Sequence, residues 1–177
     1  MNAGLFRTLV ARGLRRLDDV APPGTVHAHC DIPCGIYDPH LAQIAAHTVV
    51  RMNQLISDLG DAPGPGDQAK NDAWHNSLAR YVAVKEEHAE LVKKEVRIIW
   101  GDYFKPEHLE KYPDLHATVW NIMKLGSKAR QTADLQAAQD LLAEVQKFAE
   151  IFWATKGAST ERRPSRQTSG GEIVYPV

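Results

Sequence analysis

Apolar positions recur at three- and four-residue spacing along most of the chain after residue 39. In the first such segment, Leu41, Ile44, Met52 and Leu55 fall on one face of a helix. Comparable stripes follow, and long helices are predicted over 39–59, 67–100, 113–125 and 132–155. A short helical turn is expected over 107–112, between the second and the third long helix.

Helix-breaking residues mark the ends of these segments. Asp38 can cap the first helix, and the Gly- and Pro-rich run 60–66 ends it. Gly101 is expected to end the second helix, and Gly126 with Ser127 the third. Because short loops join helices that run in opposite directions, the pattern predicts an all-α fold, an antiparallel up-down four-helix bundle.

The first 28 residues differ from the helical part. Residues 1–28 hold a basic amphipathic stretch in which Arg7 and Arg12 interrupt the apolar run, unlike a secretory signal. Ala28 partly resembles the small residue that precedes a cleavage site. We expect 1–28 to be a leader and the protein to be cytoplasmic; a disordered N-terminal arm is the alternative.

The last residues also differ in composition. Residues 158–177 are rich in Gly, Ser, Thr, Pro and Arg, which predicts a flexible C-terminal tail. Within the tail, only 172–175 shows an alternation typical of a strand. The alternative is a recognition or docking segment, because the tail carries Arg162, Arg163 and Arg166.

Composition and charge exclude several classes of protein. The chain has 177 residues, 44% of them hydrophobic, and a formal net charge of -1. This balance argues against nucleic acid or an anionic membrane as a partner. No apolar run approaches the roughly 18 residues of a membrane helix. The 2 cysteines rule out a disulfide scaffold.

Both cysteines lie just before the first helix, where they flank a proline. His29, Cys30 and Cys34 fall within six residues, and Pro33 with Gly35 favours a compact turn that brings both sulfurs to one centre. Thiolates are soft ligands that suit nickel, zinc, copper(I) or iron–sulfur clusters. On spacing alone, a redox disulfide, half of a zinc site and thiols without a role remain open.

Removal of the leader would change the chemistry of this segment. Cleavage after Ala28 makes His29 the first residue, and its free α-amine has a pKa near 8. The amine, the Cys30 amide and two thiolates then offer two nitrogens and two sulfurs in one plane, an arrangement that suits Ni(II). The His29 imidazole can reach an axial position.

At this point the sequence resembles a known family. Residues 29–39 read HCDIPCGIYDP and resemble the N-terminal hook of nickel-containing superoxide dismutases. Further segments that fit the family are KEEHAEL at 85–91, WGDYFKP at 100–106, EKYPDLH at 110–116 and IFWATK at 151–156. The resemblance spans roughly residues 29–157, a four-helix bundle domain with the hook at 29–39.

The resemblance implies an enzyme that disproportionates superoxide to O₂ and H₂O₂ at one Ni(II)/Ni(III) ion per subunit. It assigns His29, Cys30 and Cys34 as the nickel ligands. It also implies that a processing protease removes the propeptide 1–28 and that the subunits form a homohexamer. A helical protein that binds nickel, or exchanges thiols and disulfides, without dismutase turnover is the alternative.

The resemblance also implies roles for four side chains around the metal. Tyr37 and Tyr103 would lie over its open face, hold water or peroxide and limit access. Asp31 would position backbone or protons within the hook, and Lys105 would attract the anionic substrate.

Two positions depart from the family pattern. Ala45 stands where relatives have a glutamate that hydrogen-bonds the axial imidazole, and His88 stands where they have an arginine. Because the pair has changed together, we expect His88, or a water it holds, to orient the His29 ring.

Overall fold

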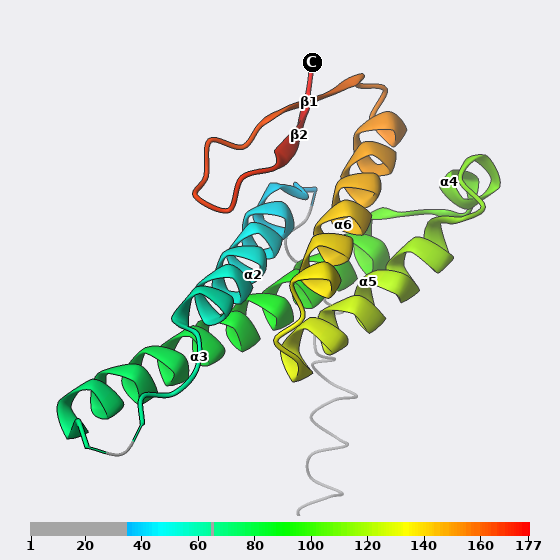
Figure 1. Ribbon diagram of the computed structural model, residues 1–177. Helices are drawn as coiled ribbons and strands as arrows, with labels where there is room; N and C mark the ends of the chain where they lie inside the picture. Colours follow the sequence, from blue (N-terminus) through cyan, green and yellow to red (C-terminus); the bar gives the residue numbers. More distant parts are fainter. Residues whose placement is uncertain (1–34, 65) are drawn as a thin grey trace, which may run out of the picture. The chain divides into compact units, whose positions relative to one another are not determined.

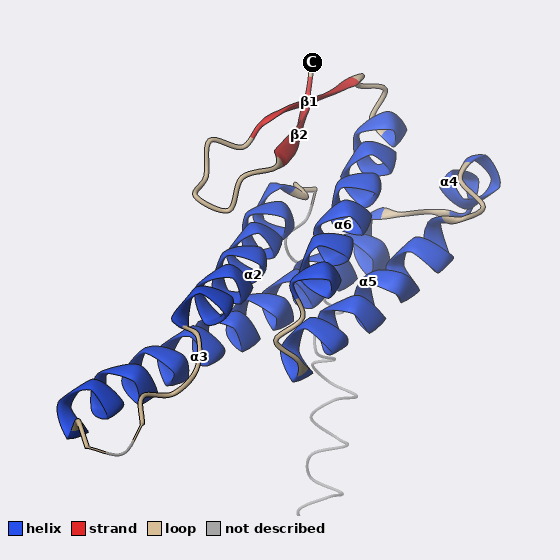
Figure 2. Cartoon of the chain, viewed as in Figure 1, coloured by secondary structure: helices blue, strands red, loops and turns tan. Residues whose placement is uncertain are grey.

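Four long helices and a small hairpin make up the computed structural model, which describes residues 35–64 and 66–177. The long helices are α2 (His40–Leu59), α3 (Gln68–Ile98), α5 (Leu115–Gln131) and α6 (Leu135–Thr155) (Figure 1). Between α3 and α5 lie the π-helix η1 (Ile99–Tyr103) and the short helix α4 (Pro106–Lys111). The strands β1 (Thr160–Pro164) and β2 (Glu172–Pro176) follow α6 (Figure 2).

Each long helix lies against two others. α2 packs on α3 and α6, and α5 packs on the same two helices. Consecutive long helices run in opposite directions (Figure 1). The predicted all-α class and antiparallel four-helix bundle are therefore confirmed, with a two-stranded sheet added at the C-terminal end.

Aspartate side chains cap the first turns of two long helices, α3 and α6. Asp67 accepts a hydrogen bond from the backbone N–H of Lys70 at 3.1 Å. Asp134 accepts one from the backbone N–H of Ala137 at 3.0 Å. Each bond satisfies a donor in the first turn that has no partner inside the helix.

The core combines small residues on α2 with large ones on α6. Ala42, Ala45 and Ala46 are at most 1% exposed, and Phe148 and Phe152 are fully buried. The alanines let the helices approach closely, and the aromatic rings fill the space between them. Burying a side chain as large as phenylalanine stabilises the fold by roughly 1.5–3 kcal/mol.

Only the second half of α3 enters this core. The buried residues of α3 all lie between Lys85 and Val96, so its stretch from Gln68 to Val84 contributes none. Lys85 is 3% exposed, and its ammonium donates a hydrogen bond to the carbonyl oxygen of Thr132. Burial lowers the pKa of Lys85, because the charged form loses its hydration.

α5 continues past Gly126 and Ser127, so the prediction that these residues end the helix is wrong. A Cβ at position 126 would lie 3.0 Å from Cγ of Lys93 on α3, which makes Gly126 a point of close approach between helices. The hydroxyl of Ser127 donates to the carbonyl oxygen of Met123 at 3.0 Å. Tertiary packing here outweighs the low helix propensity of glycine.

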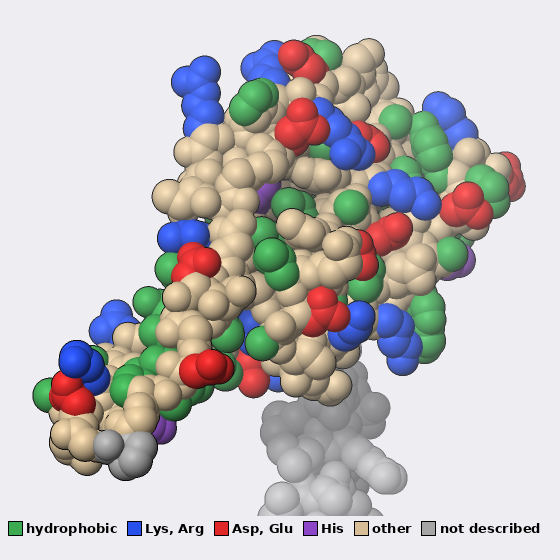
Figure 3. Space-filling model, viewed as in Figure 1, with side chains coloured by type: hydrophobic (Ala, Val, Ile, Leu, Met, Phe, Trp, Pro, Cys, Tyr) green, Lys and Arg blue, Asp and Glu red, His purple; other side chains and the backbone are tan. Residues whose placement is uncertain are grey.

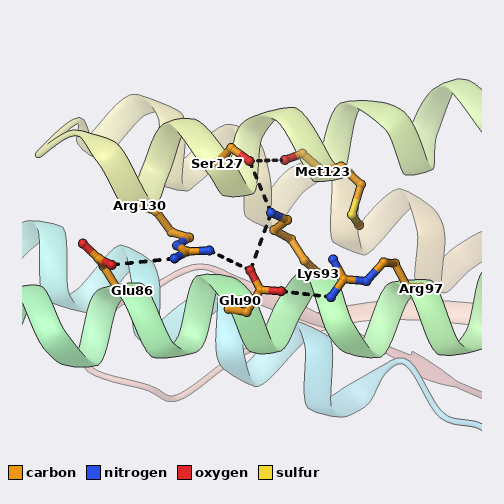
Figure 4. A network of polar contacts seen from close by, with 7 residues as sticks. All are labelled: Glu86, Glu90, Lys93, Arg97, Met123, Ser127 and Arg130. Carbon is orange, nitrogen blue, oxygen red and sulfur yellow. Dashed lines mark hydrogen bonds and ion pairs between the residues drawn. The ribbon is translucent and has the colours of Figure 1, made fainter.

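A network of charges joins the exposed sides of α3 and α5 (Figure 4). Glu90 accepts hydrogen bonds from Arg97 at 2.9 Å and from Arg130 at 2.7 Å. Lys93 lies 3.5 Å from Glu90 and donates to Ser127 at 3.3 Å. The Arg97 hydrogen bond, supported by the neighbouring cations, lowers the pKa of Glu90. Because these groups are partly exposed, the network adds modest stability that salt weakens.

The C-terminal segment forms a hairpin, so the prediction of a flexible tail over 158–177 is wrong. β1 pairs with β2 in antiparallel register, with Arg162 opposite Val174. Ile173 and Val174 are 1% and 2% exposed, and the second strand coincides with the strand-like alternation at 172–175. The loop between the strands lies beside the first half of α2 (Figure 1).

Side chains of α2 and α6 hold this hairpin. Gln43 donates to the carbonyl oxygen of Val174 at 3.1 Å and accepts from its N–H at 2.8 Å. His47 and Gln146 both contact the carbonyl oxygen of Glu172. On the surface, Arg162 forms a 2.7 Å ion pair with Glu150. The hairpin is thus built into the bundle by partners distant in sequence.

The surface carries charges of both signs. Figure 3 shows Lys and Arg side chains interspersed with Asp and Glu over the face in view, without one dominant patch. Among the helices of the described ranges, none is both long enough and apolar enough to cross a bilayer.

Candidate metal centre

The predicted metal ligands lie outside the described residues. His29, Cys30 and Cys34, together with Asp31, belong to the first 34 residues. Within 35–64 and 66–177, no group of three or more His, Cys, Asp or Glu side chains could hold a metal ion. The donor set itself fits nickel, because two thiolates with nitrogen donors suit Ni(II) better than hard cations such as Mg²⁺.

The residues that follow these ligands are anchored to the bundle. The Asp38 carboxylate accepts a hydrogen bond from the backbone N–H of His40 at 2.7 Å, at the first turn of α2. Pro39 is buried between them, while Ile36 is 80% exposed. Asp38 and Pro39 thus hold the backbone in place immediately after Tyr37.

The structure brings the two predicted tyrosines together. The rings of Tyr37 and Tyr103 lie with their centroids 5.7 Å apart and their planes tilted by 53°. Tyr37 precedes α2, whereas Tyr103 ends the π-helix η1. The wide turn of η1 follows α3 directly and presents the Tyr103 ring towards the start of α2. Two segments distant in sequence therefore meet beside the end of the predicted hook.

An aromatic cluster fixes the ring of Tyr103. It stacks on His108 with an 18° angle between planes, and its centroid lies 4.7 Å from that of Phe152. Phe104 contacts the ring edge-on at 5.2 Å. With neighbours on several sides, the ring has little freedom to turn.

The hydroxyl of Tyr103 has a defined donor direction. It lies 2.9 Å from the Thr155 hydroxyl, which donates its own hydrogen to the carbonyl oxygen of Phe152 at 2.6 Å. Because the Thr155 hydrogen is already used, Tyr103 donates to Thr155. The Tyr103 oxygen is left with its lone pairs as an acceptor. Thr155 was not among the residues selected from the sequence, although it lies in the family-like segment 151–156.

Two lysines lie near Tyr103 in sequence or in space. Lys105 is exposed in the connector before α4, and its backbone N–H donates to His108 at 3.1 Å. Lys156 was not selected from the sequence, yet its ammonium lies 5.5 Å from the Tyr103 ring centroid and 4.9 Å from that of Phe152. A cation over aromatic faces is held by the ring quadrupoles. Lys156 therefore places a positive charge beside Tyr103.

The two positions that depart from the family pattern lie on neighbouring helices. Ala45 is 1% exposed on the buried side of α2. His88 is half-buried on α3, and its Nδ1 lies 2.9 Å from the carbonyl oxygen of Val84. A carbonyl oxygen only accepts, so Nδ1 carries the hydrogen and Nε2 has the lone pair in the neutral ring.

The fold and these residues define a class of protein: a helical bundle in which two tyrosines meet where a thiolate-bearing N-terminal segment joins the first long helix. The sequence model of the nickel-containing superoxide dismutase family matches residues 24–156. The chain belongs to this family. The matched range ends just before the C-terminal hairpin.

Individual relatives agree with this assignment. Superoxide dismutase [Ni] of Streptomyces coelicolor is 41% identical over 138 residues, which cover 78% of this chain and 95% of the relative. Superoxide dismutase [Ni] of Streptomyces seoulensis is 38% identical over the same length.

Solved structures agree as well. The native structure of nickel superoxide dismutase superposes with a TM-score of 0.61 at 38% identity, covering 72% of this chain and 99% of that one. A structure of the apo enzyme gives a TM-score of 0.60 at 35% identity. The predicted family, with its superoxide dismutase activity and its nickel cofactor, is confirmed.

Proposed function

We propose that this nickel superoxide dismutase becomes active when cleavage after Ala28 makes His29 the first residue. His29, Cys30 and Cys34 would then hold the metal, with the Cys30 amide as a further nitrogen donor. The observation that carries this proposal is the meeting of Tyr37 and Tyr103, 5.7 Å apart, next to the end of this ligand segment. Bound nickel supplies one-electron redox chemistry through Ni(II) and Ni(III).

The reaction needs protons as well as electrons. Two superoxide anions and two protons give O₂ and H₂O₂, so the site must hold protonated oxygen species. The Tyr103 oxygen, with its hydrogen directed to Thr155, accepts a hydrogen bond from water or peroxide. Tyr37 packs on it and narrows the approach. Asp31, within the ligand segment, would position backbone or protons there.

Positive charge favours the approach of the anionic substrate. Lys105 is exposed in the connector that follows Tyr103, and the Lys156 ammonium lies over the Tyr103 ring. Residues 29–158 hold 14 Lys and Arg against 18 Asp and Glu, so this part of the chain is mildly acidic. Both lysines raise the local concentration of superoxide despite that negative charge.

Three further features complete the proposal. The mature enzyme is a homohexamer, because packing against other subunits gives a short terminal segment the fixed environment that a redox metal needs. A processing protease removes 1–28. The enzyme is cytoplasmic, because Arg7 and Arg12 interrupt the apolar run that an export signal needs.

The test uses protein that begins at His29 and has been loaded with nickel. We expect one nickel per chain, a Ni(III) electron paramagnetic resonance signal and rapid superoxide decay. Cys30→Ser and Cys34→Ser should each lose all three. The circular dichroism spectrum of both variants should stay that of the parent, which separates loss of metal from loss of fold.

Two other outcomes would contradict the proposal. Bound zinc without superoxide decay would favour a structural metal site. Nickel bound at one per chain without turnover would favour a nickel-binding protein that lacks dismutase activity.

A further inference from the structure

A cavity of about 240 Å³ lies between α2 and the loop that joins β1 to β2. Its loop side belongs to the C-terminal segment that the family match does not reach, whereas its helix side lies within the match. The helix lines it with Ile44, His47, Thr48, Arg51 and Met52, and the loop lines it with Gln167, Thr168 and Ser169. Figure 1 shows this loop alongside the first half of α2.

Hydrogen bonds from α2 hold the loop side of the cavity in place. The Ser169 hydroxyl lies 2.9 Å from Nδ1 of His47, and the Ser169 carbonyl oxygen accepts from Gln54 at 3.1 Å. Nε2 of His47 lies 3.0 Å from the carbonyl oxygen of Glu172, so Nε2 carries the hydrogen. The cavity is therefore preformed by a docked hairpin rather than by a loose end.

The charge of the lining is positive. Arg51 carries a formal charge, and no Asp or Glu lines the cavity. The Arg51 guanidinium donates to the neutral side chain of Gln54 at 3.2 Å. Within the part of the chain that the structure describes, no carboxylate lies within ion-pair distance of Arg51. A half-buried cation thus lines a cavity of mixed polar and apolar character, without a counter-charge among the described residues.

The loop adds neutral donors next to this cation. Thr168 and Gln167, which line the cavity, carry a hydroxyl and a carboxamide. The Thr48 hydroxyl donates to the carbonyl oxygen of Ile44 at 3.1 Å, so its hydrogen is already used. Planar guanidinium with neighbouring hydroxyl and amide donors is the combination that recognises phosphate and carboxylate oxygens.

We propose that this cavity binds a phosphate group, with Arg51 as its counter-charge and Thr168 as a second donor. The phosphate is either inorganic phosphate or the head of a small phosphate monoester, for which the cavity volume leaves room. Because helix and loop both line the cavity, the ligand bridges α2 and the hairpin. A ligand that binds only the docked hairpin stabilises that docked state.

The experiment titrates the full chain with inorganic phosphate at constant ionic strength, followed by calorimetry and by ³¹P nuclear magnetic resonance. We expect saturable binding of one phosphate per chain. Arg51→Gln should weaken it about tenfold or more, because a charge-assisted hydrogen bond is lost. Arg80→Gln, at an exposed arginine of α3 outside the cavity, is the matched control and should bind like the parent.

Two further arms identify the ligand and its effect. Glycerol 3-phosphate binding more tightly than inorganic phosphate would identify a monoester, and the reverse would identify the free ion. Phosphate should also slow hydrogen exchange at the amide of Val174, and Thr168→Val should reduce this protection without changing the circular dichroism spectrum. No saturable phosphate binding, or equal affinity in the parent and Arg51→Gln, would overturn the proposal.

Discussion

The hydroxyl of Tyr103 points to Thr155, and this single contact decides what the tyrosine can do. As long as Thr155 donates to the carbonyl oxygen of Phe152, Tyr103 donates to Thr155 and presents only lone pairs elsewhere. We propose that Tyr103 then accepts hydrogen bonds from protonated oxygen species. Its ring is held by packing, so the hydroxyl is the part that a substitution at Thr155 would release.

Replacing Thr155 by valine should remove this orientation while keeping the shape of the side chain. The expected loss in kcat/KM for superoxide is about fivefold, since a net hydrogen bond contributes about 1 kcal/mol. Thr155→Ser keeps the hydroxyl and should retain activity. Superoxide decay followed across a range of pH checks this, because release of the Tyr103 hydroxyl should change the pH profile. An unchanged rate and profile in Thr155→Val would show that the contact is only structural.

His88 stands where relatives have an arginine, and we expect His88, or a water that it holds, to orient the His29 ring. Its Nδ1 lies against the carbonyl oxygen of Val84, so the hypothesis assigns Nε2 to the His29 ring or to a water. His88→Ala should reduce superoxide decay about tenfold and alter the Ni(III) resonance, as is typical when a ligand loses its hydrogen-bond partner.

A matched control lies on the same helix. His75 is exposed, and its Nδ1 makes the same kind of contact, 2.8 Å from the carbonyl oxygen of Asn71. His75→Ala should leave both the rate and the resonance unchanged. If His88→Ala also changes neither, the hypothesis about His88 is wrong.

Individual site residues were predictable from sequence only where a motif marks them. The spacing of His29, Cys30 and Cys34 predicts a metal site because soft donors cluster there. Thr155 and Lys156 were missed, because their relevance depends on their distance to Tyr103, 52 positions away for Thr155. The proximity of Tyr37 to Tyr103 likewise comes from tertiary packing.

At the scale of elements, the hairpin shows how the helices accept an added segment. Gln43, which is 1% exposed, gives both its donor and its acceptor to the backbone of Val174. The Gln43 side chain thus pairs with Val174 as the backbone of a neighbouring strand would, and it satisfies the buried N–H and carbonyl oxygen of Val174.

Gln43→Ala should therefore release the hairpin. Two buried backbone groups would lose their partners, and we expect a loss of about 2 kcal/mol in the free energy that keeps the hairpin docked. Hydrogen exchange at the Ile173 and Val174 amides measures this local opening. Gln68→Ala, at an exposed glutamine of α3, serves as the control. Equal protection in Gln43→Ala and the parent would rule out this anchoring role.

His47 makes the docking of the hairpin depend on pH. Burial lowers the pKa of His47, and the hydrogen bond to Glu172 opposes this effect only in part. A lowered folded pKa means that the unfolded chain binds the proton more readily. The stabilisation is therefore complete above the unfolded pKa of about 6.5 and is lost as pH falls through the lower folded pKa.

Chemical denaturation between pH 7.5 and 5 would detect this effect. The parent should lose stability towards acid, and His47→Gln should lose less over the same interval. A parallel pH dependence in both proteins would exclude His47 as the source.

The sequence predicted the helices better than it predicted their ends or the hairpin. Apolar periodicity located all four long helices because each buries one face against its neighbours. The composition around Gly126 and in 158–177 was misleading for one shared reason. At Gly126, close contact with Lys93 stabilises a helix that the local sequence disfavours. In the C-terminal segment, hydrogen bonds from Gln43 to Val174, 131 positions away, stabilise a hairpin that the local composition disfavours.

At the scale of the whole molecule, we propose that the bundle is a scaffold and that the chemistry takes place at the N-terminus created by cleavage. The described helices fix Pro39, Tyr37 and Tyr103, and the predicted ligands lie just before them. We propose that activity depends on one covalent event, the cleavage that turns the backbone amide of His29 into an amine. An amide nitrogen in a peptide bond has no lone pair available for a metal unless it loses its proton.

The most direct test of this account compares two nickel-loaded chains that differ by one residue. One begins at His29 and the other at Ala28, and superoxide decay is measured for both under the same conditions. We expect rapid decay with the first chain and little above background with the second, because Ala28 blocks the amine of His29. Equal activity in the two chains would contradict it.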